Sequence, residues 1–280
     1  MTLFFPNFFI PGAAKSGTTT LHELLSFHPD ICMSTVKEPV YWNNTDIEHP
    51  DRIQWYNSIF ENRNAKIVGE STTSYMYYSE FITNVKKYFE NTPKFIFILR
   101  NPIDRCYSHY WWMVGRGQEK KSFRACIEFD QNREFSNYGY VPNYYYHFGL
   151  YGKWIGGFVD AFGEENIKII TLEQLQGDVL NTLNDCLLFL NVDPLESIPY
   201  IQANKTSKLK HPKLFHFIKK TASGKYKYTK IAKYIISKEK INQIKTQLKE
   251  MPYFKGSTPF EYPEITQEDR LWLKGIYQSD

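Results

Sequence analysis

The stretch from 12 to 20, near the start of the chain, combines glycines, a lysine and hydroxyl side chains, which is the chemistry of an anion site. It follows an apolar run at 8–10 and precedes apolar residues at helical spacing, so the pattern predicts a strand, a tight turn and a helix. Such a turn aims free backbone N–H groups and the positive end of a helix dipole at one point. The candidate anion ligands are Lys15, Ser16, Gly17, Thr18, Thr19 and Thr20.

The order of residues in this stretch differs from the common nucleotide loop. Lys15 stands before the second glycine, Gly17, whereas the phosphate loop of nucleoside triphosphatases has its lysine after the second glycine. Considered alone, the stretch is also compatible with an ordinary strand-to-helix turn that carries an exposed lysine.

Glu38 is a candidate general base. It stands between Lys37 and Pro39, and a residue before proline is pushed toward extended backbone geometry. We therefore expect its carboxylate on a fixed, non-helical segment after a short strand at 31–34. A surface carboxylate that pairs with Lys37 is the simpler alternative.

Arg100 and Ser108 predict a second anion site. Arg100 directly follows 95–99, five apolar residues typical of a strand buried on both faces of a parallel sheet. Ser108 lies on the helix predicted from 103 to about 113. A nucleotide with phosphates at both ends of its ribose would occupy both anion sites. His109, on the same helix, is another candidate base, for which a structural role is the alternative.

Strands alternate with helical segments up to residue 190, which predicts an α/β fold with a parallel sheet covered on both faces. Ligands of such sheets bind beyond the carboxyl ends of the strands. The loop at 12–17, Glu38, Ser71 and Arg100 are expected to converge there. The segment 115–147 is predicted to be irregular, and its tyrosines at 138–146 either stack against sugar rings or fill the core.

The chain of 280 residues is predicted to be one domain, 1–280, with a basic, mainly helical C-terminal appendage at about 205–280. From Lys205 to Lys249 there are fourteen lysines and one acidic residue, Glu239. This block favours an anionic partner, which could be a polyanion or the surface of a membrane that the protein contacts peripherally. The alternative is that the block is a solvated basic face.

No apolar run reaches the roughly 18–20 residues needed to cross a bilayer, and the N-terminus lacks the features of a signal peptide. The four cysteines have no metal-like spacing and are predicted to be free thiols. We therefore expect no transmembrane segment, no metal and a cytoplasmic location. The cysteines are Cys32, Cys106, Cys126 and Cys186.

Two motifs together resemble a known enzyme family. The run 15–19 resembles the 5′-phosphosulfate loop of sulfotransferases that use 3′-phosphoadenylyl sulfate (PAPS), and the run 99–110, with Arg100, Arg105 and Ser108, resembles their 3′-phosphate motif. Lys37-Glu38-Pro39 followed by aromatic residues is similar to the carbohydrate-acting branch, which includes the heparan sulfate sulfotransferases. The similarity covers roughly residues 6–195.

The resemblance implies a three-layer P-loop-like fold and transfer of a sulfuryl group from PAPS to a hydroxyl or amine of a saccharide or glycoconjugate, leaving adenosine 3′,5′-bisphosphate (PAP). It assigns Lys15 to charge stabilisation and Glu38 to proton removal. It implies that Ser16, Gly17, Thr18, Thr19 and Thr20 bind the 5′-phosphate, with Lys15 among them, and that Arg100 and Ser108 bind the 3′-phosphate. Lys255, in a late basic loop, would be a further contact with the nucleotide.

Two alternatives remain at this point. One is a P-loop-type kinase; the other is a non-catalytic protein that keeps the fold and binds an anionic polymer through its basic appendage. The segment 70–73 lacks a lysine that several heparan-acting relatives carry, so the acceptor and the position sulfated stay open. The sequence does not predict a nucleic-acid partner or an oligomeric state.

Overall fold

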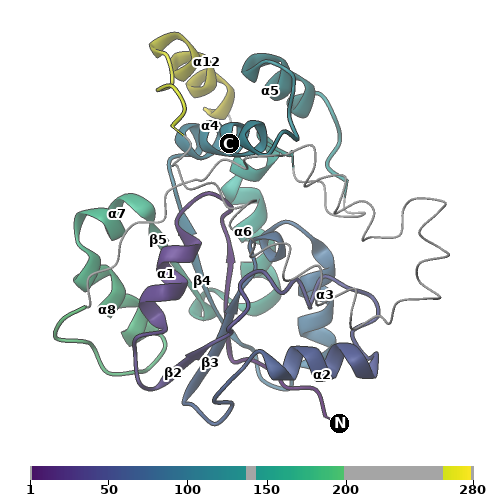
Figure 1. Ribbon diagram of the computed structural model, residues 1–280, viewed down its shortest axis with the longest axis vertical. Helices are drawn as coiled ribbons and strands as arrows, with labels where there is room; N and C mark the ends of the chain where they lie inside the picture. Colours follow the sequence, from purple (N-terminus) through teal and green to yellow (C-terminus); the bar gives the residue numbers. More distant parts are fainter. Residues whose placement is uncertain (1, 137–142, 199–260, 279–280) are drawn as a thin grey trace, which may run out of the picture. The chain divides into compact units, whose positions relative to one another are not determined.

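The computed structural model describes residues 2–136, 143–198 and 261–278. At its centre lies a five-stranded parallel sheet in the order β2-β3-β1-β4-β5 (Figure 1). The predicted parallel α/β fold is confirmed. The strands are β1 (Phe8–Gly12), β2 (Ile31–Met33), β3 (Ile67–Ser71), β4 (Lys94–Leu99) and β5 (Ile167–Thr171).

The three central strands are apolar because both of their faces are covered. Every residue of β1 and β3 is buried, and only the two end residues of β4 are partly exposed. Side chains of a strand alternate between faces, so Phe9 and Phe95 belong to the core on one face, whereas Phe8 and Ile96 belong to the core on the other.

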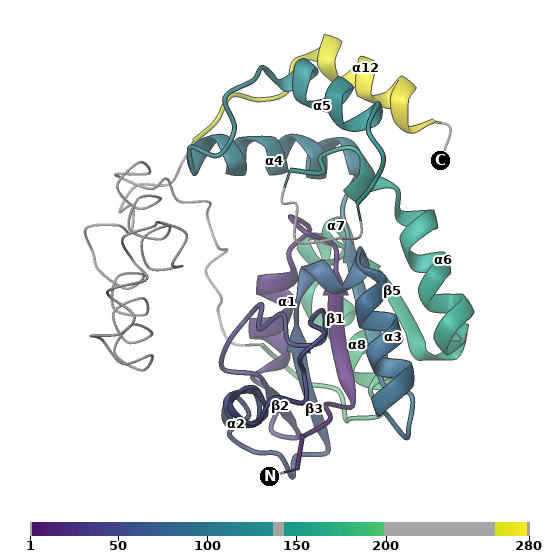
Figure 2. The ribbon, with the colours of Figure 1, turned by 90° about the vertical axis from the view of Figure 1, so that its right-hand side faces the viewer.

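Helices cover both faces and make three layers, as predicted (Figure 2). One core, which contains Phe8 and Ile96, lies beneath α1 (Thr18–Leu25), α7 (Leu172–Gly177) and α8 (Val179–Phe189). The other, which contains Phe9 and Phe95, lies beneath α2 (Pro50–Ser58), α3 (Ser79–Tyr88) and α6 (Tyr151–Phe162). Single turns η1 (Thr73–Met76), η2 (His147–Gly149) and η3 (Glu164–Asn166) connect them.

The remaining helices are α4 (Pro102–Gly115), α5 (Phe123–Gln131) and α12 (Gln267–Tyr277). The prediction that 115–147 is irregular is wrong, because α5 lies in it. Cys126, Ile127 and Asp130 share a buried face at helical spacing, a pattern that charged neighbours obscure in the sequence. Arg124 of α5 donates to Asp269 of α12 at 2.6 Å, and Arg270 of α12 pairs with Asp104 of α4 at 2.7 Å.

The chain divides into two compact units, one of which comprises 110–123 and 205–265. Within it, the Trp111 ring stacks on Tyr262 with centroids 5.9 Å apart. The single domain with a helical appendage stays a prediction. The lysine-rich block at 205–249, the tyrosines at 138 and 140, and Lys255 lie outside the described residues.

Tyr144 and Tyr145 are 2% and 1% exposed, so these two members of the tyrosine cluster fill the core. The four cysteines are free thiols, as predicted.

Candidate active site

The loop between β1 and α1 presents an uncapped helix end. Lys15 and Gly17 have left-handed backbones, with φ of 70° and 94°, and Gly17 is the N-cap residue of α1. No side chain in the described part of the chain caps this helix, and the N–H groups of its first turn, Thr18–Thr20, lack helical partners. A Cβ on Gly17 would lie 2.7 Å from Cδ1 of Leu172, so both the conformation and the packing require glycine there.

Ser16 adds a second donor inside this loop. Its side chain is fully buried, and its Oγ has no hydrogen-bond partner within the described residues. Burial raises the pKa of Tyr151, and its phenol, which donates to the carbonyl of Arg100 at 2.9 Å, lies close enough to Ser16 for Ser16 to oppose that rise. A buried hydroxyl without a partner in this loop suits a bound anion, because leaving it unpaired is costly.

Arg100 and Ser108 follow the strand beside this loop. The N–H of Ala13 donates to the carbonyl of Ile98 at 2.8 Å, which fixes the loop against the end of β4. Ser108 is 6% exposed and lies one turn beyond Arg105 on α4. The guanidinium of Arg105 is buried and donates to the carbonyl of Tyr145, so Arg105 is a structural member of this motif.

His109 is 3% exposed and its ring lies parallel to Phe148, with centroids 5.8 Å apart. Its Nδ1 lies 3.4 Å from Nη1 of Arg105. These contacts favour the structural role of His109 over that of a base.

Glu38 lies at the end of β3, which pairs with β1 on the side opposite to β4. Its backbone N–H donates to the carbonyl of Ser71 at 2.9 Å, and its carboxylate accepts from the Thr73 N–H at 2.9 Å and from the Thr73 hydroxyl at 3.2 Å. The expected extended geometry is wrong: Glu38 is left-handed, with φ of 58°. The turn that brings its N–H to β3 outweighs the local preference of a residue before proline.

Lys37 joins Glu38 to the anion loop, a role that the sequence does not reveal. Its Nζ donates to the Glu38 carboxylate at 2.8 Å and to the hydroxyl of Thr18 at 3.3 Å. The predicted surface pair therefore exists, and it also connects the candidate base to the candidate phosphate ligands. The side chains of Lys37 and Glu38 are 22% and 38% exposed, so solvent and an acceptor can reach them.

His22, one turn after Thr18 on α1, is another residue that sequence reasoning missed. Its Nδ1 lies 2.8 Å from the hydroxyl of Ser71. Burial, and then the positive charge of Lys37, lower the pKa of His22 from 6.5 to about 4, so its ring is neutral at pH 7. A neutral imidazole adds no charge to this corner of the site.

The strand order arranges these groups in a line. Glu38 is bonded to the end of β3 through Ser71, Lys15 follows β1 and Arg100 follows β4, and these three strands are neighbours in the sheet. Adjacent strands lie about 4.8 Å apart. The candidate base, the anion loop and the motif of Arg100 and Ser108 thus lie side by side at the carboxyl edge.

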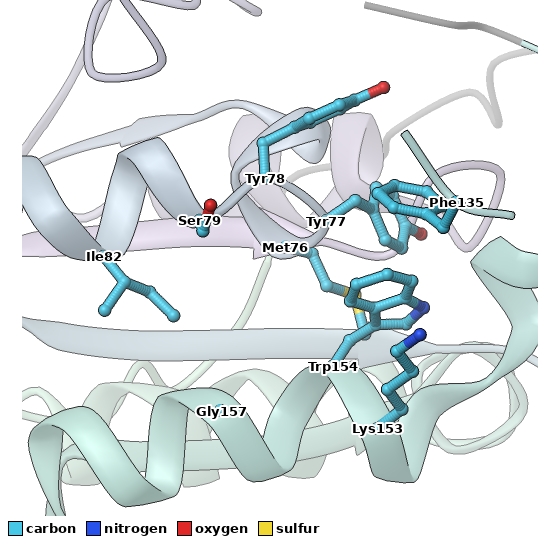
Figure 3. Close-up of a pocket in the computed structure, with 9 residues that line it drawn as sticks. All are labelled: Met76, Tyr77, Tyr78, Ser79, Ile82, Phe135, Lys153, Trp154 and Gly157. Atoms are coloured by element: carbon cyan, nitrogen blue, oxygen red, sulfur yellow. The ribbon is translucent and has the colours of Figure 1, made fainter. Parts of the chain in front are cut away.

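A pocket of about 300 Å³ lies between α3 and α6 near this edge (Figure 3). Tyr77, in its wall, accepts a hydrogen bond from the Ala14 N–H at 3.2 Å, which connects the pocket to the anion loop. Lys153 lies over the Trp154 ring, 4.8 Å from its centroid. The lining residues are Met76, Tyr77, Tyr78, Ser79, Ile82, Phe135, Lys153, Trp154 and Gly157.

The chain matches the sulfotransferase domain family over residues 5–251 and therefore belongs to that family. A solved sulfotransferase from Alicyclobacillus acidocaldarius is similar to it, with a TM-score of 0.61 and 29% identity over 72% of this chain and 87% of that one. The predicted sulfotransferase resemblance and fold are confirmed.

Curated relatives point to the same branch as the sequence motif. Mouse carbohydrate sulfotransferase 15 is 23% identical over 68% of this chain and 44% of that protein. The membrane-associated sulfotransferase kil1 of Dictyostelium discoideum is 33% identical over 42% of this chain and 25% of that protein. Heparan sulfate sulfotransferases are also among the relatives, so the predicted resemblance to the carbohydrate-acting branch is confirmed.

The predicted cytoplasmic location is wrong. A similar protein is membrane-associated by name, and this chain spans less than half of the curated relatives above, so its own ends carry no information about location. Among the described residues, no helix is long and apolar enough to span a membrane. In the same part of the chain, no three His, Cys, Asp or Glu side chains are grouped so that they could hold a metal ion.

Proposed function

We propose that this protein is a PAPS-dependent sulfotransferase that transfers a sulfuryl group to a hydroxyl or amine of a saccharide or glycoconjugate. The observation that supports this most is the order of Glu38, Lys15 and Arg100 at the ends of three neighbouring strands, β3, β1 and β4. A nucleotide with its 3′-phosphate at Arg100 and its 5′-phosphate over Lys15 would direct its sulfur toward Glu38.

The residues of the loop fit such a donor. The uncapped start of α1 offers N–H groups to the 5′-phosphate, and the buried, unpaired Ser16 hydroxyl offers one more. Arg100 and Ser108 would hold the 3′-phosphate. When bound, PAPS would supply the activated sulfuryl group. Lys255, outside the described residues, is proposed as a further nucleotide contact.

Glu38 is proposed as the general base. Its two oxygens are held by Lys37 and Thr73, and the side chain remains open to solvent, so it can accept a proton from an acceptor placed in line with the sulfur. Lys15 would neutralise charge on the oxygen that leaves. Sulfuryl transfer resembles phosphoryl transfer, where positioning and charge stabilisation dominate the rate.

For Glu38→Gln we expect turnover to fall by about 10² to 10⁴, the usual contribution of a general base, with PAP affinity unchanged. Arg100→Ala should instead weaken PAP binding. Calorimetric titration with PAP and a transfer assay separate the two effects. Normal turnover in Glu38→Gln would remove Glu38 from the mechanism.

Carbohydrate sulfotransferases among the relatives support a saccharide acceptor. The pocket beside the loop is a candidate contact, since aromatic rings offer flat faces to sugars and Lys153 offers a charge to a sulfate or carboxylate (Figure 3). The lysine-rich block would attract the same polyanion or a membrane surface, and a steep fall in activity with salt would support the polyanion.

A thermal shift measurement with three ligands tests the proposal against its alternatives. Stabilisation by PAP, but not by ATP with Mg²⁺, is expected for a sulfotransferase. Stabilisation by ATP with Mg²⁺ would support a kinase. A response to heparin alone would support a polymer-binding protein without catalysis.

A further inference from the structure

Glu70, which the mechanism above does not use, is a fully buried carboxylate at the centre of a hydrogen-bond network. It lies on β3, next to Ser71, and is 0% exposed. Three hydroxyls donate to it: Tyr56 at 2.7 Å and Tyr75 at 2.9 Å to Oε1, and Thr72 at 2.8 Å to Oε2. They come from α2, from η1 and from the turn after β3, so Glu70 joins three parts of the chain.

Each of these hydroxyls also accepts a hydrogen bond from the segment that follows Glu38. The Thr72 hydroxyl accepts from the Val40 N–H at 3.4 Å, and the Tyr75 hydroxyl accepts from the Trp42 N–H at 3.1 Å. The Tyr56 hydroxyl accepts from the indole Nε1–H of Trp42 at 2.8 Å. Three hydroxyl bridges therefore connect one buried carboxylate to Val40 and Trp42.

The hydrogen-bond pattern of this network suits the ionised form of Glu70. A hydroxyl has one proton, and all three protons point at Glu70, which leaves their lone pairs for the N–H groups of Val40 and Trp42. A protonated Glu70 would itself have to donate to one hydroxyl. That hydroxyl could then no longer donate its own proton to Glu70 and would have to rotate.

The segment held by this network is the one that carries the candidate base. Glu38 and Val40 are both left-handed, with φ of 58° and 54°, a strained conformation for a residue with a side chain that persists only when its surroundings impose it. Thr72 and Thr73 lie in the turn that donates to the Glu38 carboxylate. The same buried group thus fixes both sides of Glu38.

We propose that Glu70 is a positioning residue for sulfuryl transfer, whose ionised carboxylate orders the 38–42 segment and so aims Glu38 at the acceptor. This inference rests on the proposed function.

The ionisation of Glu70 falls in the physiological range. Burial raises the pKa of Glu70 from 4.5 to about 7; the three hydroxyl bonds oppose that rise, and the negative charge of Glu38 adds to it. Burial, followed by the charge of Glu70, raises the pKa of both Tyr56 and Tyr75 well above 10, so these two phenols stay neutral. Activity should therefore increase as pH rises through about 7.

Glu70→Gln tests the proposal. Its amide would donate where the carboxylate accepts, so one bridge must break. We expect kcat to fall by about 10- to 100-fold, as for an ångström-scale misplacement of a catalytic group, with the KM for the donor and the Kd for PAP unchanged. The rise of kcat across pH 7 should disappear. Unchanged kcat with the wild-type pH profile would overturn the proposal.

Tyr56→Phe and Tyr75→Phe each remove one bridge and cover the case in which Glu70→Gln does not fold. Both should lower kcat without changing PAP affinity. Tyr88→Phe is the matched control, because the Tyr88 hydroxyl also donates to a glutamate, Glu48, at 2.6 Å but has no bond to Glu70. Equal kcat values for Tyr56→Phe, Tyr75→Phe and Tyr88→Phe would contradict the proposal.

A spectroscopic measurement separates this proposal from the proposed function. The indole N–H signal of Trp42, assigned with Trp42→Phe, should shift with a midpoint near pH 7 in the wild type and not in Glu70→Gln. If the wild type transferred no sulfuryl group, the proposed function would fail, and the Trp42 shift would still decide the network. A Trp42 signal that does not shift near pH 7 would refute the network.

Discussion

The raised pKa of Glu70 makes the stability of the protein depend on pH in a way that needs no ligand. The carboxyl has a pKa of 4.5 when unperturbed and about 7 in the folded protein, where burial disfavours its charge. Between these values the unfolded chain binds fewer protons at this position than the folded one, so stability falls as pH rises. The favourable contribution is complete below about 4.5 and lost above about 7.

The size of this effect follows from the shift. One pKa unit corresponds to 1.36 kcal/mol, so the wild type should lose about 3 kcal/mol across this window relative to Glu70→Gln, which does not titrate. Urea unfolding of both proteins from pH 4 to 8 measures it. Other titrating groups are common to the two proteins and cancel in the difference. A difference in stability that stays constant over this range would refute the assigned burial of the charge.

Further variants test the loop and its surroundings. Gly17→Ala should lower stability by about 1–3 kcal/mol through its left-handed backbone and its contact with Leu172, whereas Gly156→Ala, in open space within α6, should not; thermal melting compares them. Ser16→Ala should leave the melting temperature of the ligand-free protein equal or higher, because a buried unpaired hydroxyl is removed, yet weaken PAP binding in calorimetry. A Ser16→Ala protein with wild-type PAP affinity would exclude this hydroxyl from the site. His22 contributes stability that is lost as pH falls from about 6.5 to about 4, opposite in sign to Glu70, so the stability of the wild type relative to His22→Gln should decrease as pH falls over that range; a constant difference in urea unfolding would contradict the lowered pKa of His22.

The sequence was sufficient for features that depend on local pattern. The apolar run 95–99 and the residues around 12–17 predicted a buried strand and a strand-to-loop-to-helix unit, both of which the structure contains. Because carboxyl ends of parallel strands share one edge, the sequence predicts that Glu38, Lys15 and Arg100 converge there, whereas the strand order and the bond of Glu38 to the end of β3 come only from the structure.

Features that depend on contacts across the fold could not be read from the sequence. Lys37 looked like a partner of Glu38 alone, and its bond to Thr18 appears only once α1 lies beside the end of β3. Nothing in the sequence distinguishes Glu70, because its three hydroxyl partners come from positions 56, 72 and 75. The left-handed Glu38 likewise reflects its bond to Ser71, which overrides the influence of Pro39.

The role of Glu38 in sulfuryl transfer can be measured by the transfer of labelled sulfate from PAPS to a panel of saccharides, by the wild type and by Glu38→Gln. We expect label in at least one saccharide with the wild type and a loss of about 10² to 10⁴ in rate with Glu38→Gln, while both proteins bind PAP equally. Label transferred equally by both proteins, or a wild type that binds no PAP, would contradict it.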